Sequence, residues 1–220
     1  MNTFILLELA AAVSAGLGFL SGAMKYLRPH KPLYASMIVL GTACIMLGHA
    51  YTFMRMITGL PVRGIFHVGC LGTVGAFAFF FSSNYGQIDS LVDDGSKSFL
   101  KYRALAFLSV ILTAGLYILI LLSPASAAEK FTDGIVTLSV AAAGYFHLKH
   151  MIIPDIDYGV VRCLRLFNVL ALIYAVMCMA EMLVSAYGRN DLLPAVVIIR
   201  CILSVLFVPV MDKGVRKWST

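Results

Sequence analysis

Five ionisable side chains stand inside long apolar stretches of the sequence: Glu8, His49, His67, Glu181 and Arg200. A charged side chain at the centre of a membrane helix costs about 2.5–3.5 kcal/mol on insertion scales, so each group requires a partner or a water-filled cavity. Arg200 stays charged and presents a rigid fork of N–H donors, which suits a carboxylate or a phosphate. His49 and His67 titrate near neutral pH and could couple protons to binding. These residue types together predict a polar ligand-binding pocket.

A structural interpretation of the same residues stays open. Glu181 is the expected resting partner of Arg200, and a ligand anion could compete for the guanidinium. Alternatively, the two form a permanent buried ion pair, while the histidines bond helix backbones and hold the bundle together. Glu8 stands close enough to the end of its apolar run to be merely interfacial.

Seven apolar runs must position these groups, because a helix needs about 20 mostly apolar residues to cross a bilayer. The runs cover residues 4–25, 33–57, 61–84, 101–123, 132–153, 162–187 and 192–211. In the whole chain of 220 residues, 60% are hydrophobic and 13% are charged, which excludes an ordinary soluble domain and a disordered chain. We therefore predict an all-α, polytopic membrane protein whose seven transmembrane helices form a single bundle over residues 1–220.

The positive charges predict the orientation of this bundle. Of the 17 Lys and Arg residues, twelve lie on the side that carries the C-terminus, four lie on the opposite side, and Arg200 lies within a run. Cytoplasmic loops of membrane proteins are enriched in Lys and Arg. We therefore expect an N-out/C-in protein of the plasma (inner) membrane, with a cytoplasmic C-terminus.

The predicted runs also place the five ionisable groups at similar depths. At 1.5 Å per residue from the outer ends, Glu8 lies roughly 6 Å deep, and His67 and Glu181 lie roughly 9 Å deep. His49 and Arg200 lie roughly 12 Å deep by the same rule. The sequence therefore predicts one polar layer in the outer half of the membrane.

The two ends of the chain resemble each other. Pro61 and Pro194 stand near the starts of their runs, and His67 and Arg200 each follow six residues after that proline. This likeness predicts parallel repeats over residues 1–84 and 130–212, joined by a linker helix at 101–123. A chance likeness between apolar helices is the alternative. Close helix contacts are expected at Gly18 with Gly22, and at Gly72 with Ala76.

Two resemblances to known families bear on function. The 3+1+3 plan resembles the architecture of the SWEET sugar transporters and the PQ-loop proteins, which implies transport through parallel repeats. The Pro-Gln pair of the PQ-loop proteins is absent, so no residue role is carried over. The segments His30-Lys31-Pro32-Leu33 and Leu47-Gly48-His49-Ala50 resemble the lysoplasmalogenase-like membrane family, which implies hydrolase chemistry. That family has an aspartate where this chain has His49, and this chain is one span shorter.

Three functions follow from these observations. We favour a small permease that binds a small, possibly anionic, solute in an outward-facing pocket. A ligand-sensing or accessory membrane protein is the first alternative, because Asn168 and Thr137 are the only polar residues that suggest a path through the inner half. A membrane hydrolase is the second alternative.

The expected partners are the lipid bilayer, a small-molecule ligand, and a second copy or another membrane protein. Nucleic acid is not expected, because the basic residues form no patch with aromatic residues.

Neither a catalytic set, a cofactor nor a metal is expected. The cysteines form no CxxC pair and no zinc-ligand cluster, and we interpret all five as buried hydrophobic residues: Cys44, Cys70, Cys163, Cys178 and Cys201. His147 and His150 are expected at the inner water boundary rather than as haem ligands. The aromatic run at 77–81 is expected to face lipid or the membrane interface.

Overall fold

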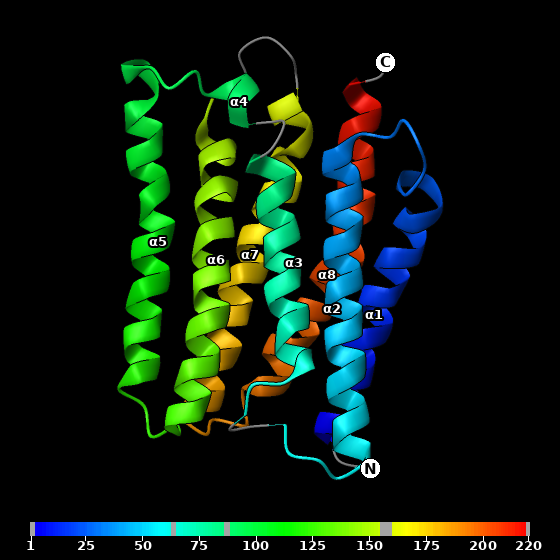
Figure 1. The fold of residues 1–220 in the computed structure, drawn as a ribbon, viewed down its shortest axis with the longest axis vertical. Coiled ribbons are helices and arrows are strands. Elements are labelled where there is room, and N and C mark those ends of the chain that lie inside the picture. Colours follow the sequence, from blue (N-terminus) through cyan, green and yellow to red (C-terminus); the bar gives the residue numbers. More distant parts are fainter. Residues whose placement is uncertain (1–2, 63–64, 86–88, 155–159, 219–220) are drawn as a thin grey trace.

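The computed structural model describes residues 3–62, 65–85, 89–154 and 160–218, and every regular element in these ranges is helical. The elements are α1 (Thr3–Tyr26), α2 (Leu33–Ile57), α3 (Val68–Tyr85), α4 (Asp89–Val92), the 3-10 turn η1 (Lys97–Phe99), α5 (Leu100–Leu121), α6 (Ala127–Ile152), α7 (Val160–Ala186) and α8 (Leu193–Trp218). The long helices lie side by side with alternating direction, and the N- and C-termini lie at opposite ends of the bundle (Figure 1).

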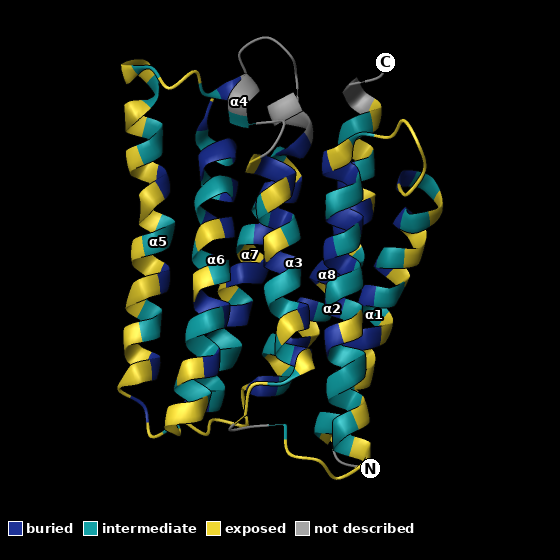
Figure 2. Ribbon diagram, viewed as in Figure 1, coloured by how far each residue is buried: buried dark blue, intermediate teal, exposed yellow. Residues whose placement is uncertain are grey.

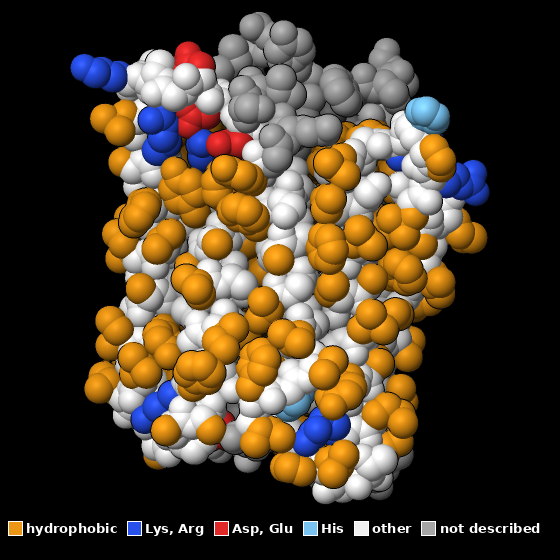
Figure 3. All heavy atoms as spheres, in the orientation of Figure 1, with side chains coloured by type: hydrophobic (Ala, Val, Ile, Leu, Met, Phe, Trp, Pro, Cys, Tyr) orange, Lys and Arg blue, Asp and Glu red, His pale blue; other side chains and the backbone are white. Residues whose placement is uncertain are grey.

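The described helices have the length and composition of membrane spans. Six of them, namely α1, α2, α5, α6, α7 and α8, are long and apolar enough to cross a membrane. Hydrophobic side chains cover the middle of the visible face, whereas Lys and Arg lie near its two ends (Figure 3). The predicted all-α helical membrane architecture is confirmed.

The third predicted span, at residues 61–84, begins later than the hydropathy indicates. Helix α3 starts at Val68 and has 18 residues, and it is not among the six long apolar helices. Gly59, two residues after the end of α2, lies in the left-handed region with φ 70°, and Pro61 has no N–H to give to a helix. The Arg55 side chain donates from Nε and Nη2 to the carbonyl oxygen of Pro61, at 2.9 and 2.6 Å. These contacts tie the segment that precedes α3 to the end of α2.

Six of the long helices pack in a closed order. Helix α1 contacts α2, α2 contacts α3, α3 contacts α6, α6 contacts α7, α7 contacts α8, and α8 returns to α1. Helix α5 packs outside this order, against α6 and α7. Much of its surface is exposed, and the exposed side chains are largely apolar (Figure 2). The exposed face of α5 is therefore suited to lipid.

Glycines permit the closest helix contacts. A Cβ atom on Gly72 of α3 would lie 2.5 Å from the Cα of Gly48 on α2, and one on Gly18 of α1 would lie 2.6 Å from the carbonyl oxygen of Ser204 on α8. Real Cβ atoms do not approach other atoms this closely, so these positions require glycine. Gly18 and Gly72 therefore lie at helix contacts, as predicted.

Aromatic side chains fill the centre of the bundle. Phe77 and Phe80 of α3 are fully buried, together with Phe167 and Tyr174 of α7 and Phe207 of α8. The ring centroids of Phe80 and Phe207 lie 5.0 Å apart, close to an edge-to-face arrangement. The expectation that this aromatic run faces lipid is wrong for Phe77 and Phe80, because residues three apart share one helix face and this face points inward.

Candidate functional site

A cavity of about 740 Å³ lies at the end of the bundle that holds the N-terminus. Its walls come from the six helices of the closed order and from the connections at that end. Exposed residues of these connections, including Leu60, Pro61 and Asn190, line its outer part. Along α8, the lining residues deepest in the bundle are Val197 and Arg200. The cavity therefore extends from the surface to a buried guanidinium.

All five sequence-predicted residues line this one cavity. Glu8 comes from α1, His49 from α2, His67 from the segment before α3, Glu181 from α7 and Arg200 from α8. The structure therefore brings together side chains that are up to 192 residues apart in the sequence.

Arg200 is held by two partners. It is 5% exposed, its Nη1 donates to the Glu181 carboxylate, and its Nη2 donates to the Tyr174 hydroxyl at 2.9 Å. The guanidinium carbon also lies 4.9 Å from the centroid of the Tyr174 ring. The buried Nε of Arg200 has no hydrogen-bond partner among the described residues. Glu181 is thus the resting partner of Arg200, and its Nε–H remains available.

Glu8 and His49 form the second hydrogen-bonded pair of the cavity. Nδ1 of His49 lies 2.8 Å from Oε2 of Glu8, and the side chains are 12% and 16% exposed. An ionised carboxylate only accepts hydrogen bonds, so His49 carries a proton on Nδ1. Glu8 is therefore bonded inside the bundle rather than standing free at the interface.

His67 fixes the backbone that surrounds it. The Gly69 N–H donates to Nδ1 of His67 at 3.0 Å, so this nitrogen is the acceptor of the ring. The other nitrogen, Nε2, lies 3.2 Å from the carbonyl oxygen of Val62 and donates to it. Both ring nitrogens are therefore used by the backbone, and the ring is neutral. This arrangement matches the structural interpretation of His67.

Asp133 is a cavity residue that sequence analysis missed. It lies on α6, six residues after the start of this helix, and its carboxylate makes no hydrogen bond or ion pair with another described residue. In the sequence it stands second in the run 132–153, a position where a carboxylate is ordinarily solvated. The capping box of Ser126 and Glu129 begins α6 earlier and places Asp133 inside the bundle. That Ser-x-x-Glu pattern was the available signal.

A second polar cluster closes the opposite end of the bundle. Asn84 of α3 joins two helices: its Nδ2 lies 2.9 Å from Nδ1 of His147 and 3.1 Å from Oδ1 of Asn168, and its Oδ1 lies 2.8 Å from Nδ1 of His150. These four side chains are fully buried. His147 and His150 therefore do not lie at the water boundary as expected.

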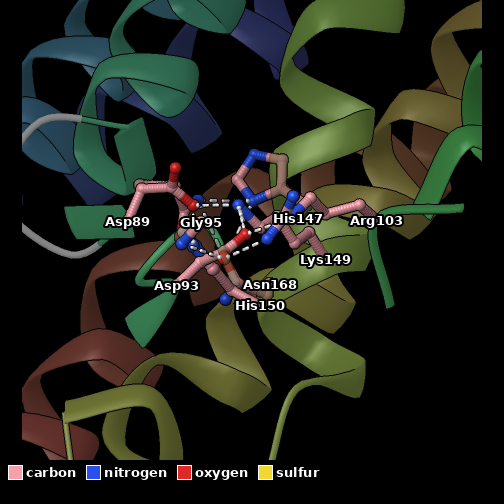
Figure 4. A network of polar contacts seen from close by, with 9 residues as sticks. Asp89, Asp93, Gly95, Arg103, His147, Lys149, His150 and Asn168 are labelled. Carbon is pink, nitrogen blue, oxygen red and sulfur yellow. Dashed lines mark hydrogen bonds and ion pairs between the residues drawn. The ribbon is translucent and has the colours of Figure 1, made fainter. Parts of the chain in front are cut away.

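The connection between α3 and α5 covers this cluster. Asp89 of α4 accepts from Nζ of Lys149 at 2.6 Å and lies 2.9 Å from Nε2 of His150. Asp93 accepts from Lys149 at 2.7 Å and from Arg103 at 2.9 Å. Figure 4 shows these side chains converging from α4, α5, α6 and the intervening segment. Two acidic residues of a loop thus seal a polar core that their sequence positions did not predict.

These contacts shift the pKa values of the loop carboxyls. Burial alone would raise the pKa of Asp93, but hydrogen bonds from Lys149, Arg103 and the Gly95 N–H outweigh it and lower the pKa to about 2. Asp89 follows the same pattern: burial opposes ionisation, while His150 and Lys149 lower the pKa below its ordinary value. Both carboxylates are therefore charged at neutral pH.

The cysteines and the other polar groups form no recognisable metal site in the described part of the chain. No three His, Cys, Asp or Glu residues are arranged there to hold a metal ion. Cys178 is buried, Cys44, Cys70 and Cys201 are half-buried, and the side chain of Cys163 lies outside the described residues. The cavity can bind and orient a solute through charged and hydroxyl groups.

Comparisons with known proteins assign no function, so the function is argued from the geometry of the cavity. No protein-family model, curated protein or solved structure matches the chain.

Proposed function

We propose that this protein is a small permease whose solute occupies the cavity near the N-terminus. The observation that carries the proposal is the asymmetry of the described residues: one end of the bundle holds a cavity of about 740 Å³ lined by ionisable side chains, and hydrogen-bonded, fully buried side chains gather toward the other end. This volume lies within the range of about 300–1,000 Å³ that is usual for small-molecule sites. The positive-inside rule assigns the cavity to the outer side.

The contacts between the cavity and the opposite end of the bundle support a gate that opens when the cavity closes to the outside. Below the cavity lie the rings of Phe80, Phe167 and Phe207 in edge-to-face contact, followed by the hydrogen bonds between Asn84, His147 and Asn168. In alternating access, one group of helices rocks against another around a fixed site. Such a movement can break and remake the hydrogen bonds between α3, α6 and α7. The loop carboxylates of Asp89 and Asp93, which bind Lys149, are well placed to restrain the movement.

The packing order supports the proposed 3+1+3 repeat. If α1, α2 and α3 correspond to α6, α7 and α8, then each contact of the closed order has a counterpart in the other half. The contact of α3 with α6 corresponds to that of α8 with α1. Helix α5 lies outside this order and has no counterpart, as a linker requires. Parallel repeats of this kind belong to transporter architecture.

A ligand-sensing protein is the second candidate, and the same asymmetry favours it. A sensor needs a cavity on one side only, and buried aromatic residues and a polar cluster lie between Arg200 and the opposite end of the described bundle. The hydrolase alternative has less support. His49 is bonded to Glu8, but no described Ser, Thr or Cys side chain is hydrogen-bonded to His49.

Accessibility of Cys70 distinguishes the permease from the sensor, because this native cysteine lines the cavity. The experiment uses a variant that keeps Cys70 and has alanine at the other four cysteines. It is labelled with a membrane-impermeant maleimide in right-side-out and inside-out vesicles. A permease is labelled in both preparations, because the cavity is exposed to each side in turn.

A matched variant that keeps only Cys44 is the control. Cys44 is half-buried on α2 and packs near Gly75 of α3 rather than in the cavity, so it should remain unlabelled in both preparations. Labelling of Cys70 only from the side of the N-terminus would overturn the permease and support the sensor. Labelling only from the side of the C-terminus would overturn the proposed path altogether.

A further inference from the structure

Every basic side chain among the described lining residues already has a partner within the protein. Arg200 is bonded to Glu181, and His49 is bonded to Glu8. His67 is neutral because its Nδ1 accepts a backbone N–H. The described lining therefore offers no unpaired positive side chain to an anionic solute.

The lining carboxylates are in excess. There are four, Glu8, Glu129, Asp133 and Glu181, and only the first and last belong to ion pairs. Glu129 is hydrogen-bonded to Ser126 in the capping box and has no ion pair among the described residues. Asp133 has neither a hydrogen bond nor an ion pair there. Among the described lining residues, acidic side chains without an ion pair therefore outnumber basic ones.

The cations that the structure describes near the entrance do not pair with Asp133. Arg55 donates to the carbonyl oxygen of Pro61, and Arg189 pairs with Asp191. Neither arginine belongs to the cavity wall, and nor does Lys130. A carboxylate held in a partly buried site without a counter-ion is costly, and a bound cation offsets this cost.

We infer that the solute is a cation, specifically an organic amine, and that Asp133 is its counter-ion. This inference rests on the proposed function and specifies its substrate class. An ammonium group supplies the charge and the hydrogen-bond donors that Asp133 lacks. The apolar part of the amine lies against lining side chains such as Leu7, Val136 and Met182. This class differs from the anion that Arg200 suggests when it is considered without its partners.

The test compares primary alkylammonium ions with carboxylates of the same chain length. Each probe is added to the purified full-length protein at pH 7, and stabilisation against thermal unfolding is measured as a function of concentration. We expect stabilisation by ammonium ions and none by the matching carboxylates. Asp133→Asn should weaken the apparent affinity for the best amine by roughly tenfold to a hundredfold, because a charge-assisted hydrogen bond is lost.

Two further variants make the result specific. Asp191→Asn removes an equal charge at the same end but outside the cavity, and it should leave amine affinity unchanged. Asp133→Glu keeps the charge and should retain binding, even if Asp133→Asn proves too unstable to purify. Unchanged amine affinity in Asp133→Asn would overturn the inference.

The outcomes separate this inference from the proposed function. Stabilisation by carboxylates, lost in Arg200→Gln, would overturn the cationic class and leave a solute-binding cavity. An absence of stabilisation by every probe of either charge would count against both the amine and the permease.

Discussion

Replacement of Glu181 by glutamine tests whether the guanidinium of Arg200 is held in a dry environment. The Arg200 side chain is 6% exposed and the Glu181 side chain is 23% exposed. Removing one partner of a buried ion pair leaves an uncompensated charge and costs about 3–5 kcal/mol. The Tyr174 hydroxyl and ring remain in contact with Arg200, so we expect the lower part of this range.

The structure supplies an exposed pair of the same chemistry as the control. Arg189 and Asp191 also form an arginine–carboxylate pair, but their side chains are 62% and 60% exposed. Exposed pairs contribute about 0–1 kcal/mol. Asp191→Asn should therefore have little effect on stability.

Thermal unfolding in detergent or nanodiscs measures the difference between the two pairs. For a chain of this size, about 1 kcal/mol shifts Tm by roughly 2–4 °C, so a cost of about 3 kcal/mol in Glu181→Gln should lower Tm by roughly 6–12 °C. Adding Arg200→Met to Glu181→Gln should recover most of this loss, because no charge is then left unpaired. Equal and small effects of Glu181→Gln and Asp191→Asn would show that water solvates the guanidinium and would refute the reasoning.

Three further predictions follow from contacts described above. Stability should fall between about pH 5 and pH 2 as Asp93 is protonated: its folded pKa is about 2 and its ordinary pKa is 3.8, so it contributes about 2 kcal/mol above pH 5 that is lost on acidification. Asp93→Asn should remove that part of the acid dependence of Tm. Gly72→Ala should destabilise the protein by about 1–3 kcal/mol through overpacking, whereas Gly115→Ala, with nothing within 4 Å of the added carbon, should be neutral. His67→Ala should accelerate hydrogen exchange at the Gly69 amide, and unchanged exchange would contradict the proposed hydrogen bond.

The sequence predicted the components of the fold better than their boundaries. Six runs of apolar residues became long helices, because hydropathy reports directly on burial in lipid. The predicted start of the span at 61–84 was wrong, because hydropathy cannot distinguish an apolar extended segment from a helix. Pro61 and the left-handed Gly59 are the local reasons, and only the contact of Arg55 with Pro61 explains where the segment lies.

The sequence likewise predicted some partners of the charged and polar residues and missed others. The partnership of Arg200 with Glu181 was predicted because both are costly in a membrane and stand on consecutive spans. The acidic partners of His150 and Lys149 were not predicted, because Asp89 and Asp93 lie in a connection whose fold over the bundle depends on tertiary contacts. Such polar clusters are assembled from distant segments, and no local pattern marks them.

The close contact of α2 with α3 restricts which helices can move independently. Gly48 and Gly72 bring the two backbones together, and the segment between them is anchored to α2 by Arg55 and to itself by His67. These two helices therefore travel as one body. In the proposed permease, an opening of the far end would then involve the seam between α3 and α6, where side-chain amides and imidazoles hold the helices together.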